Sequence, residues 1–212
     1  IVVKGCDARA LVVLEKESQI DRSQMIAIGV VCQGVGNPRA AKCAACDVHV
    51  PQHVDHVIGG ENGQTAANSP VSAADRYADL EALMSKTPDE RMAYWKQELS
   101  RCVKCYACRQ VCPLCYCKQC IVDKTRPQVI DTSPSLKGNY AWHITRAFHL
   151  AGRCIGCDEC TRACPVGIDL RLLNLTLAKA AEEQFGYRAG EATEAEPVVG
   201  SYSLQDRETF IQ

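Results

Sequence analysis

CVKCYACRQVCP occupies residues 102–113 and CIGCDECTRACP occupies residues 154–165, and these two stretches decide the fold. In each, two residues separate the first three cysteines, three residues precede the fourth, and a proline follows it. This is the spacing of bacterial iron–sulfur ligand runs. Because the whole spacing recurs together with its proline, we interpret the stretches as two copies of one cluster-binding loop.

The spacing also predicts which cysteines act together. A 4Fe-4S cube needs four thiolates converging on its corners, and a tight loop supplies three of them. In two-cluster ferredoxins the fourth cysteine of each run binds the other cluster. We therefore predict crossed ligand sets for cluster 1 and cluster 2. Set 1 is Cys102, Cys105, Cys108 and Cys164, and set 2 is Cys154, Cys157, Cys160 and Cys112.

Two other metal chemistries compete for these cysteines. Zinc also takes four thiolates, but paired C-x-x-C knuckles suffice for it, so zinc does not explain the third cysteine or the proline-terminated fourth. Cys108, Cys112 and Cys115 match the C-x-x-x-C-x-x-C spacing of radical SAM enzymes. Such an enzyme would need a barrel of strands after this motif, and the sequence that follows is too short and too helical.

Composition limits the class of protein. The chain has 212 residues, 47% of them hydrophobic, so it can bury a core in one or two domains. Its 24 basic and 25 acidic residues nearly balance, which argues against a general nucleic-acid surface. We expect no membrane span or signal peptide. An odd count of fifteen cysteines at metal-site spacing favours a reducing cytoplasm over a disulfide scaffold.

The first 60 residues predict a small α/β domain. IVVKGCD and MIAIGVVC read as strands on either side of a helix, which normally makes a parallel pair with a right-handed crossover. The chain starts at Ile1 inside an apparent strand, so we expect upstream sequence. Cys6 and Cys32 would meet at the carboxyl edge of the sheet, where KCAAC could fold over them. These four cysteines form set 3, a possible site for a third 4Fe-4S cluster, with zinc, free thiols or a redox pair as alternatives: Cys6, Cys32, Cys43 and Cys46.

The rest of the chain reads as helices around the two cluster loops. Residues 61–87 are predicted as a linker and helix, 88–188 as an α-helical dicluster ferredoxin domain, and 189–212 as a polar arm that lies on a partner or is disordered. Residues 59–70 read as a loop or linker, Ser72 opens a helix to about Ser85, and residues 140–151 read as a helix that ends at Gly152. Thr87 opens a capping box, and Asp169 starts a helix that ends at Gly186. The predicted fold class is therefore α+β.

A further trio of cysteines lies in LCYCKQC: Cys115, Cys117 and Cys120. They could bind zinc or another cluster if His143, His149 or a partner supplied a fourth ligand, and they could equally be buried thiols.

The two cluster loops with their helical insert resemble the α-helical dicluster ferredoxin subunits of heterodisulfide reductases, hydrogenases and formate dehydrogenases. VVKGCDARALV, IGVVCQG and CAAC resemble the β-subunit family of deazaflavin-reducing hydrogenases and dehydrogenases. That family carries a flavin and an iron–sulfur cluster. The resemblance implies a cluster at set 3, whereas the flavin is expected in a partner.

These features predict an iron–sulfur electron-transfer subunit of a multisubunit cytoplasmic oxidoreductase. No general base, nucleophile or substrate pocket is evident, so flavin- or metal-containing partner subunits would hold the catalytic centre. Two alternatives stay open: an enzyme subunit with a flavin in the amino-terminal domain, and a zinc-stabilised binding module.

Overall fold

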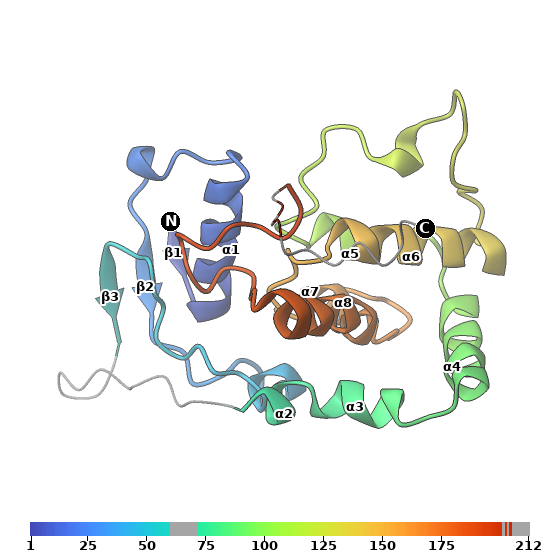
Figure 1. Ribbon diagram of the computed structural model, residues 1–212, viewed down its shortest axis with the longest axis horizontal. Coiled ribbons are helices and arrows are strands. Elements are labelled where there is room, and N and C mark those ends of the chain that lie inside the picture. Colours follow the sequence, from blue (N-terminus) through green and yellow to red (C-terminus); the bar gives the residue numbers. More distant parts are fainter. Residues whose placement is uncertain (60–71, 201, 203, 205–212) are drawn as a thin grey trace.

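The computed structural model of the chain describes residues 1–59, 72–200, 202 and 204 (Figure 1). The predicted loop or linker at residues 59–70 and the last part of the predicted arm lie largely outside these residues. Within them, no helix is long and apolar enough to cross a membrane.

The amino-terminal unit is a three-stranded parallel sheet with one main helix. β1 (Val2–Val3), β2 (Ile28–Val30) and β3 (His56–Ile58) lie in that order, with Val2 opposite Ile28 and Ile28 opposite His56. α1 (Gly5–Lys16) connects the first two strands, and its Ala8 and Leu11 bury against Val3 and Ala27. The predicted parallel strand–helix–strand pair is confirmed, while the third strand was not predicted.

α1 begins earlier than its sequence suggests. β1 ends at Val3, and the side chain of Asp7 accepts a hydrogen bond from the Lys4 amide, which satisfies this free donor at the start of the first turn. Cys6 therefore lies in the first turn of α1 and not at the end of a strand. Because this turn follows β1 directly, the carboxyl edge of the sheet still carries Cys6.

Helices build the remainder of the chain. They are α2 (Ala73–Arg76), α3 (Ala78–Met84), α4 (Pro88–Ser100), α5 (Ala107–Gln110), α6 (Leu136–His149), α7 (Glu159–Arg162) and α8 (Leu170–Phe185), with short 3₁₀ turns at Arg22–Gln24, Ala41–Cys43 and Ile121–Asp123. The mainly helical architecture beside a small parallel sheet confirms the α+β fold class.

Local capping chemistry explains most of the helix bounds. Thr87 accepts from the Glu90 amide and the Glu90 carboxylate accepts from the Thr87 amide, so α4 starts where the capping box predicts. α6 starts four residues before its predicted start because the Ser135 hydroxyl accepts from the Gly138 amide. α8 stops at Gly186, which has φ +61°. The predicted helix from Ser72 to Ser85 is instead two helices, α2 and α3, separated at Tyr77.

Two apolar layers hold the helical part together. Leu80 and Leu83 of α3 pack on Leu172 and Leu175 of α8. Leu99 of α4 packs beneath both cluster loops, together with Ile168 and Leu170. α8 thus lies between α3 and the loops, as Figure 1 shows.

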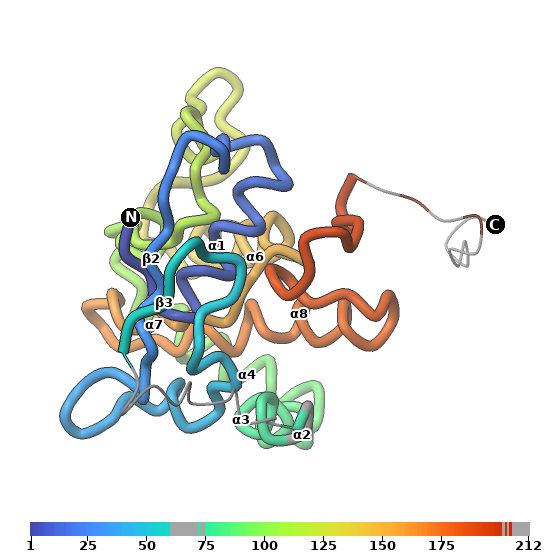
Figure 2. The backbone as a smooth tube through the Cα atoms, turned by 90° about the vertical axis from the view of Figure 1, so that its left-hand side faces the viewer, coloured from blue at the N-terminus to red at the C-terminus, as the bar shows by residue number. Residues whose placement is uncertain are grey.

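The segment after α8 returns to the amino-terminal unit. Ala189 is buried, and its carbonyl accepts hydrogen bonds from the Arg9 side chain on α1. The Lys16 ammonium donates to the carbonyls of Ala192 and Ala195. Figure 2 shows this segment leaving α8 and passing towards the chain end. The start of the predicted polar arm, up to about Ala195, therefore lies against α1 of its own chain.

Candidate metal centres

The two cysteine loops have the same backbone course. Lys104 and Gly156, each two residues after the first cysteine of its loop, have φ +55° and φ +70°. Tyr106 and Asp158, each directly after the second cysteine, have φ +58° and φ +61°. Left-handed residues alternating with right-handed ones turn successive amides to one side and form anion-binding concavities of the kind found at iron–sulfur sites.

Positive φ is unfavourable for three of these four residues, namely Lys104, Tyr106 and Asp158. A side chain other than glycine rarely adopts positive φ, and each such residue costs roughly 1–2 kcal/mol. The same cost occurs at the same offset in both loops. The short helices α5 and α7 then follow at matching positions and contact each other. The internal repeat seen in the sequence is therefore also a structural repeat, in which both loops need positive φ at the same two positions.

The four cysteines of set 1 line one cavity of about 20 Å³. Cys102, Cys105 and Cys108 come from the first loop, and Cys164 comes from the end of the second. Apolar and aromatic side chains close the cavity: Val103, Tyr106, Trp142, Pro165, Val166, Ile168 and Leu170. Cys105 is the exposed member of the set, so one side of this site faces solvent.

The four cysteines of set 2 line a second cavity of about 20 Å³. Here Cys112 reaches across from the first loop to the three cysteines of the second. This cavity also contains polar and charged side chains: Arg146, Asp158, Arg171 and Asn174. The crossed grouping expected from the spacing thus matches the grouping of side chains around the two cavities.

Three of the four thiols of set 2, those of the second loop, are poorly suited to ionise without a metal. Burial raises the pKa of Cys154 to about 11 and that of Cys157 and Cys160 to about 12. A thiolate is the metal-ligating form, so a positively charged metal centre is needed to hold these sulfurs deprotonated. All fifteen cysteines are free thiols. Four thiols around each cavity are a donor set that suits a 4Fe-4S cube.

Helix α6 brings polar side chains to both cavities, which sequence reasoning did not predict. His143 is buried, and its Nε2 lies 3.3 Å from Cys102 Sγ. One turn further, Arg146 is buried, and its guanidinium donates to the Cys108 carbonyl at 3.0 Å. The signal in the sequence was a histidine and an arginine three residues apart in YAWHITRAFHLA, on a helix face otherwise expected to be apolar.

The protonation of His143 follows from its surroundings. Burial, together with the positive charges of Arg146 and Lys104, lowers the pKa of His143 to about 4. The imidazole is therefore neutral near pH 7. Because a ligating thiolate can only accept a hydrogen bond, the favourable arrangement places the proton of His143 on Nε2, facing Cys102.

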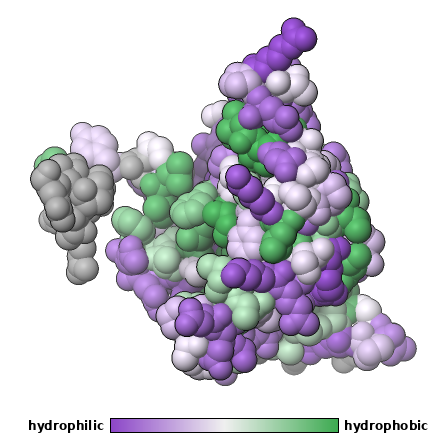
Figure 3. Space-filling model, turned by 90° about the vertical axis from the view of Figure 1, so that its right-hand side faces the viewer, coloured by the Kyte–Doolittle hydropathy of each residue, from purple (hydrophilic) through white to green (hydrophobic). Residues whose placement is uncertain are grey.

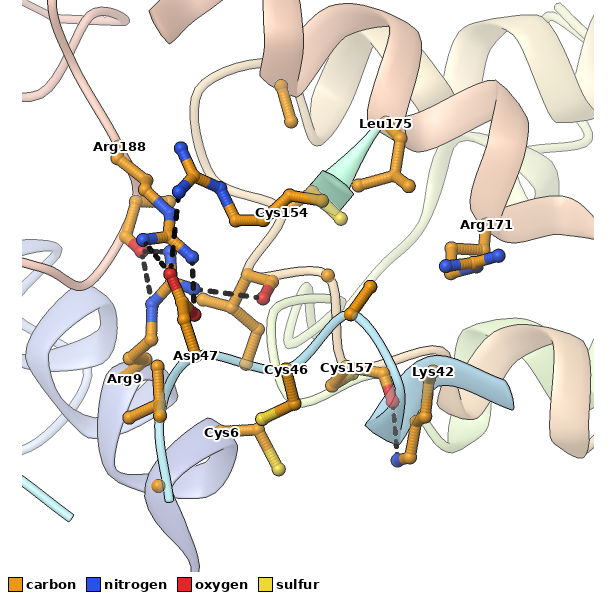
Figure 4. A pocket seen from close by; sticks show the side chains of 18 of the residues that line it. Cys6, Arg9, Lys42, Cys46, Asp47, Cys154, Cys157, Arg171, Leu175 and Arg188 are labelled. Carbon is orange, nitrogen blue, oxygen red and sulfur yellow. Dashed lines mark hydrogen bonds and ion pairs between the residues drawn. The ribbon is translucent and has the colours of Figure 1, made fainter. Parts of the chain in front are cut away.

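Set 3 lines a larger cavity of about 110 Å³ (Figure 4). Cys6 comes from α1, Cys32 follows β2, and Cys43 and Cys46 lie on the loop that covers the sheet edge. Gly5 permits this packing, because a Cβ there would lie 2.1 Å from the Val48 carbonyl oxygen. Two cysteines of set 2, Cys154 and Cys157, line the same cavity. The set 3 cavity and the set 2 loop are therefore neighbours.

Lys42 ties the set 3 loop to the set 2 loop. Its ammonium donates to the Cys157 carbonyl and to Glu159 Oε1, both at 2.6 Å, and its side chain is only 8% exposed (Figure 4). The other wall of the cavity holds Arg9 and Arg188, with Arg188 paired to Asp47 at 2.6 Å. Basic side chains thus lie on both sides of set 3.

The trio in LCYCKQC does not share a cavity with any of the three sets. Cys115 adjoins Cys112, and a hydrogen bond between the two side chains lowers the pKa of Cys112. Cys117 is exposed, and Cys120 caps the turn Ile121–Asp123. His143, one possible fourth ligand, lies instead at Cys102. In the described part of the chain, no group of three or more His, Cys, Asp or Glu side chains is placed to hold a single metal ion.

Comparison with known proteins bears on this arrangement. Residues 97–168 match the family described as 4Fe-4S dicluster domain. The chain is similar to the F420-dependent formate dehydrogenase subunit beta of Methanocaldococcus jannaschii, at 33% identity over 97 residues that cover 45% of this chain and 25% of that protein. It is also similar to the F420-dependent formate dehydrogenase 1 subunit beta of Methanococcus maripaludis, at 22% identity over an alignment of 293 positions, gaps included, that covers 94% of this chain and 75% of that protein.

The matched part of the chain spans only a quarter of the length of the Methanocaldococcus protein. The match to the dicluster family contains both complete loops and all eight cysteines of sets 1 and 2. The resemblance predicted from the loops is therefore confirmed. Residues 97–168 thus match the 4Fe-4S dicluster family, in a chain that is similar to the beta subunits of F420-dependent formate dehydrogenases.

Proposed function

We propose that this chain is an iron–sulfur electron-transfer subunit that relays electrons between partners in an oxidoreductase complex. The observation that carries the proposal is the arrangement of three cavities, each lined by one of the cysteine sets. Set 1 would hold cluster 1, set 2 cluster 2 and set 3 cluster 3. Bound 4Fe-4S clusters would supply one-electron redox chemistry, and the chain would supply thiolates, hydrogen bonds and burial.

The order of the clusters follows from the shared walls. Set 3 adjoins set 2 through Cys154 and Cys157, and the crossed ligands join set 2 to set 1. Cys105 of set 1 is exposed. The relay therefore has cluster 3 at the amino-terminal unit, cluster 2 in the middle and cluster 1 near the surface at the opposite end.

The surface near cluster 1 suits contact with a partner. Val103, between two cysteines of set 1, is 56% exposed, and Met92 of α4 and Leu136 of α6 are also exposed. Figure 3, which views the right-hand side of Figure 1, shows apolar groups among polar ones over that side of the molecule. Such a mixed surface is typical of a non-obligate protein interface.

The names of the relatives suggest the type of complex. Both are beta subunits of F420-dependent formate dehydrogenases. We therefore expect partners that oxidise a small substrate such as formate or exchange electrons with a flavin or deazaflavin, with this chain conducting electrons between them.

Iron analysis tests the proposal. Anaerobically reconstituted chain should contain about twelve irons with matching labile sulfide, and reduction should produce electron paramagnetic resonance signals from interacting clusters. About eight irons would remove cluster 3 from the relay. A colourless, zinc-containing protein would refute the relay and support the zinc-stabilised binding module.

One observation favours a second function. The set 3 cavity is larger than the other two, about 110 Å³ against about 20 Å³, and Arg9, Lys42 and Arg188 line it. A flavin held at this cavity would make the chain an enzyme subunit with its own active site. Stoichiometric flavin extracted from the isolated chain, with turnover of an organic substrate in the absence of partners, would favour this alternative.

A further inference from the structure

We propose that α6 tunes the reduction potentials of cluster 1 and cluster 2 unequally, through a hydrogen bond from His143 to cluster 1 and the positive charge of Arg146, which lines the cavity of cluster 2. The inference rests on the proposed function, because it needs both clusters to be present.

The two side chains line different cavities. His143 lines the set 1 cavity, and Arg146 lines the set 2 cavity, although its guanidinium also donates to the carbonyl of Cys108, a set 1 cysteine, at 3.0 Å. They are three residues apart on one helix, so about one turn separates them. A single helix thus presents a hydrogen-bond donor to one cluster and a cation to the next.

The environment of Arg146 lacks a carboxylate partner. Among the described residues, no acidic side chain forms an ion pair with Arg146, although it is only 4% exposed. Its Nε is buried without a hydrogen-bond partner. A buried cation normally needs a compensating anion. The sulfurs of set 2 around this cavity are the available source of negative charge once they carry a cluster.

The other basic side chains at the two cavities, Arg171 and Lys104, already have acceptors of their own. Arg171 at the set 2 cavity pairs with Asp79 and lies 3.7 Å from Asp158. Lys104 at the set 1 cavity donates from its ammonium to the Asp131 carbonyl at 2.7 Å. Arg146 is therefore the main uncompensated charge beside cluster 2.

The direction of each effect follows from electrostatics. Reduction adds one negative charge to a cluster, so a nearby cation stabilises the reduced form and raises the reduction potential. A hydrogen bond to a ligating sulfur acts in the same direction by withdrawing electron density from it. Removal of either group should therefore lower the potential of its own cluster.

The test is an anaerobic redox titration of the reconstituted full chain followed by electron paramagnetic resonance. Variants Cys105→Ser and Cys157→Ser assign the signals of cluster 1 and cluster 2. Arg146→Met should lower the potential of cluster 2 by at least about 59 mV, a tenfold change in the one-electron equilibrium, and that of cluster 1 by clearly less. His143→Phe should lower the potential of cluster 1 alone.

Conservative variants distinguish a direct effect of charge or hydrogen bonding on the potentials from an effect of altered packing. Arg146→Lys, which keeps the charge, and His143→Gln, which keeps an N–H donor, should retain potentials close to those of the parent chain. Lys137→Met removes a cation from the exposed start of α6 and should shift neither potential. If Arg146→Met loses iron, Arg146→Gln replaces it in the comparison with Arg146→Lys.

The outcomes are distinct. Variants that keep their iron but shift both potentials equally, or neither, would overturn the inference and leave the relay intact. A parent chain without two dicluster signals would instead refute the proposed function.

Discussion

Replacing Lys42 with methionine should loosen the contact between the set 3 loop and the set 2 loop. The Lys42 ammonium makes two charge-assisted hydrogen bonds of 2.6 Å, to the Cys157 carbonyl and to Glu159. Hydrogen bonds to charged groups contribute about 1.5–3 kcal/mol each, but Glu159 keeps its ion pair with Arg162 at 2.6 Å, so its carboxylate is not left unpaired. We therefore expect a loss of about 2 kcal/mol in the free energy of local opening, roughly thirtyfold in its equilibrium constant.

Native-state hydrogen exchange measures this opening directly. In Lys42→Met, exchange of the amides in residues 40–48 should accelerate roughly thirtyfold, while the amides of α4 keep the protection of the parent chain. Arg162→Met is the matched control, because it removes a cation from the same carboxylate. The Arg162 side chain is 50% exposed, so its loss should cost at most about 1 kcal/mol.

Equal acceleration in the two variants would refute this reasoning, since the effect would then come from Glu159 and not from the contact between the loops. An unchanged rate in Lys42→Met would show that apolar packing alone holds the two units together. Lys42→Arg, which can still reach a carboxylate, should retain most of the protection.

Three further predictions concern the dicluster domain. Cys164→Ser should remove cluster 1 and spare cluster 2, so iron should fall by about four per chain while the second signal remains; loss of cluster 2 alone would disprove crossed ligation. Asn139→Leu removes a side-chain amide that donates to the Leu99 carbonyl at 2.8 Å and to the Cys102 carbonyl at 2.9 Å. We expect a loss of about 2–4 kcal/mol in the free energy of unfolding and faster chelation of iron from cluster 1 only. Equal acceleration at both clusters would contradict this local role. Thr87→Ala should lower the unfolding free energy by about 1 kcal/mol in a urea titration, and an unchanged midpoint would mean that the cap does not stabilise α4.

Much of the dicluster site could be predicted from the sequence. Three ligands of a 4Fe-4S cube come from one tight loop, so the spacing of the cysteines in the sequence predicts the shape of that loop. The same holds for helix bounds that depend on neighbouring residues, such as the capping box at Thr87 and the glycine stop at Gly186. Local chemistry of this kind acts over three or four residues and is visible in a one-dimensional pattern.

Other features depended on contacts between distant segments. The split between α2 and α3 occurs at Tyr77, which is buried and donates to Glu182 of α8. The third strand, β3, pairs with β2 although its three residues show no buried side chain. Periodicity could not predict either feature, because the free energy comes from partners that are far away in the sequence.

The tertiary structure also decided what surrounds the clusters. The spacing of the cysteines predicted which of them line the same cavity. Only the fold brought His143 to Cys102, Arg146 to the set 2 cavity and Lys42 to the Cys157 carbonyl. Hydrogen bonds and charges act through space over a few ångströms, so their partners are set by how helices and loops pack and not by their separation along the chain.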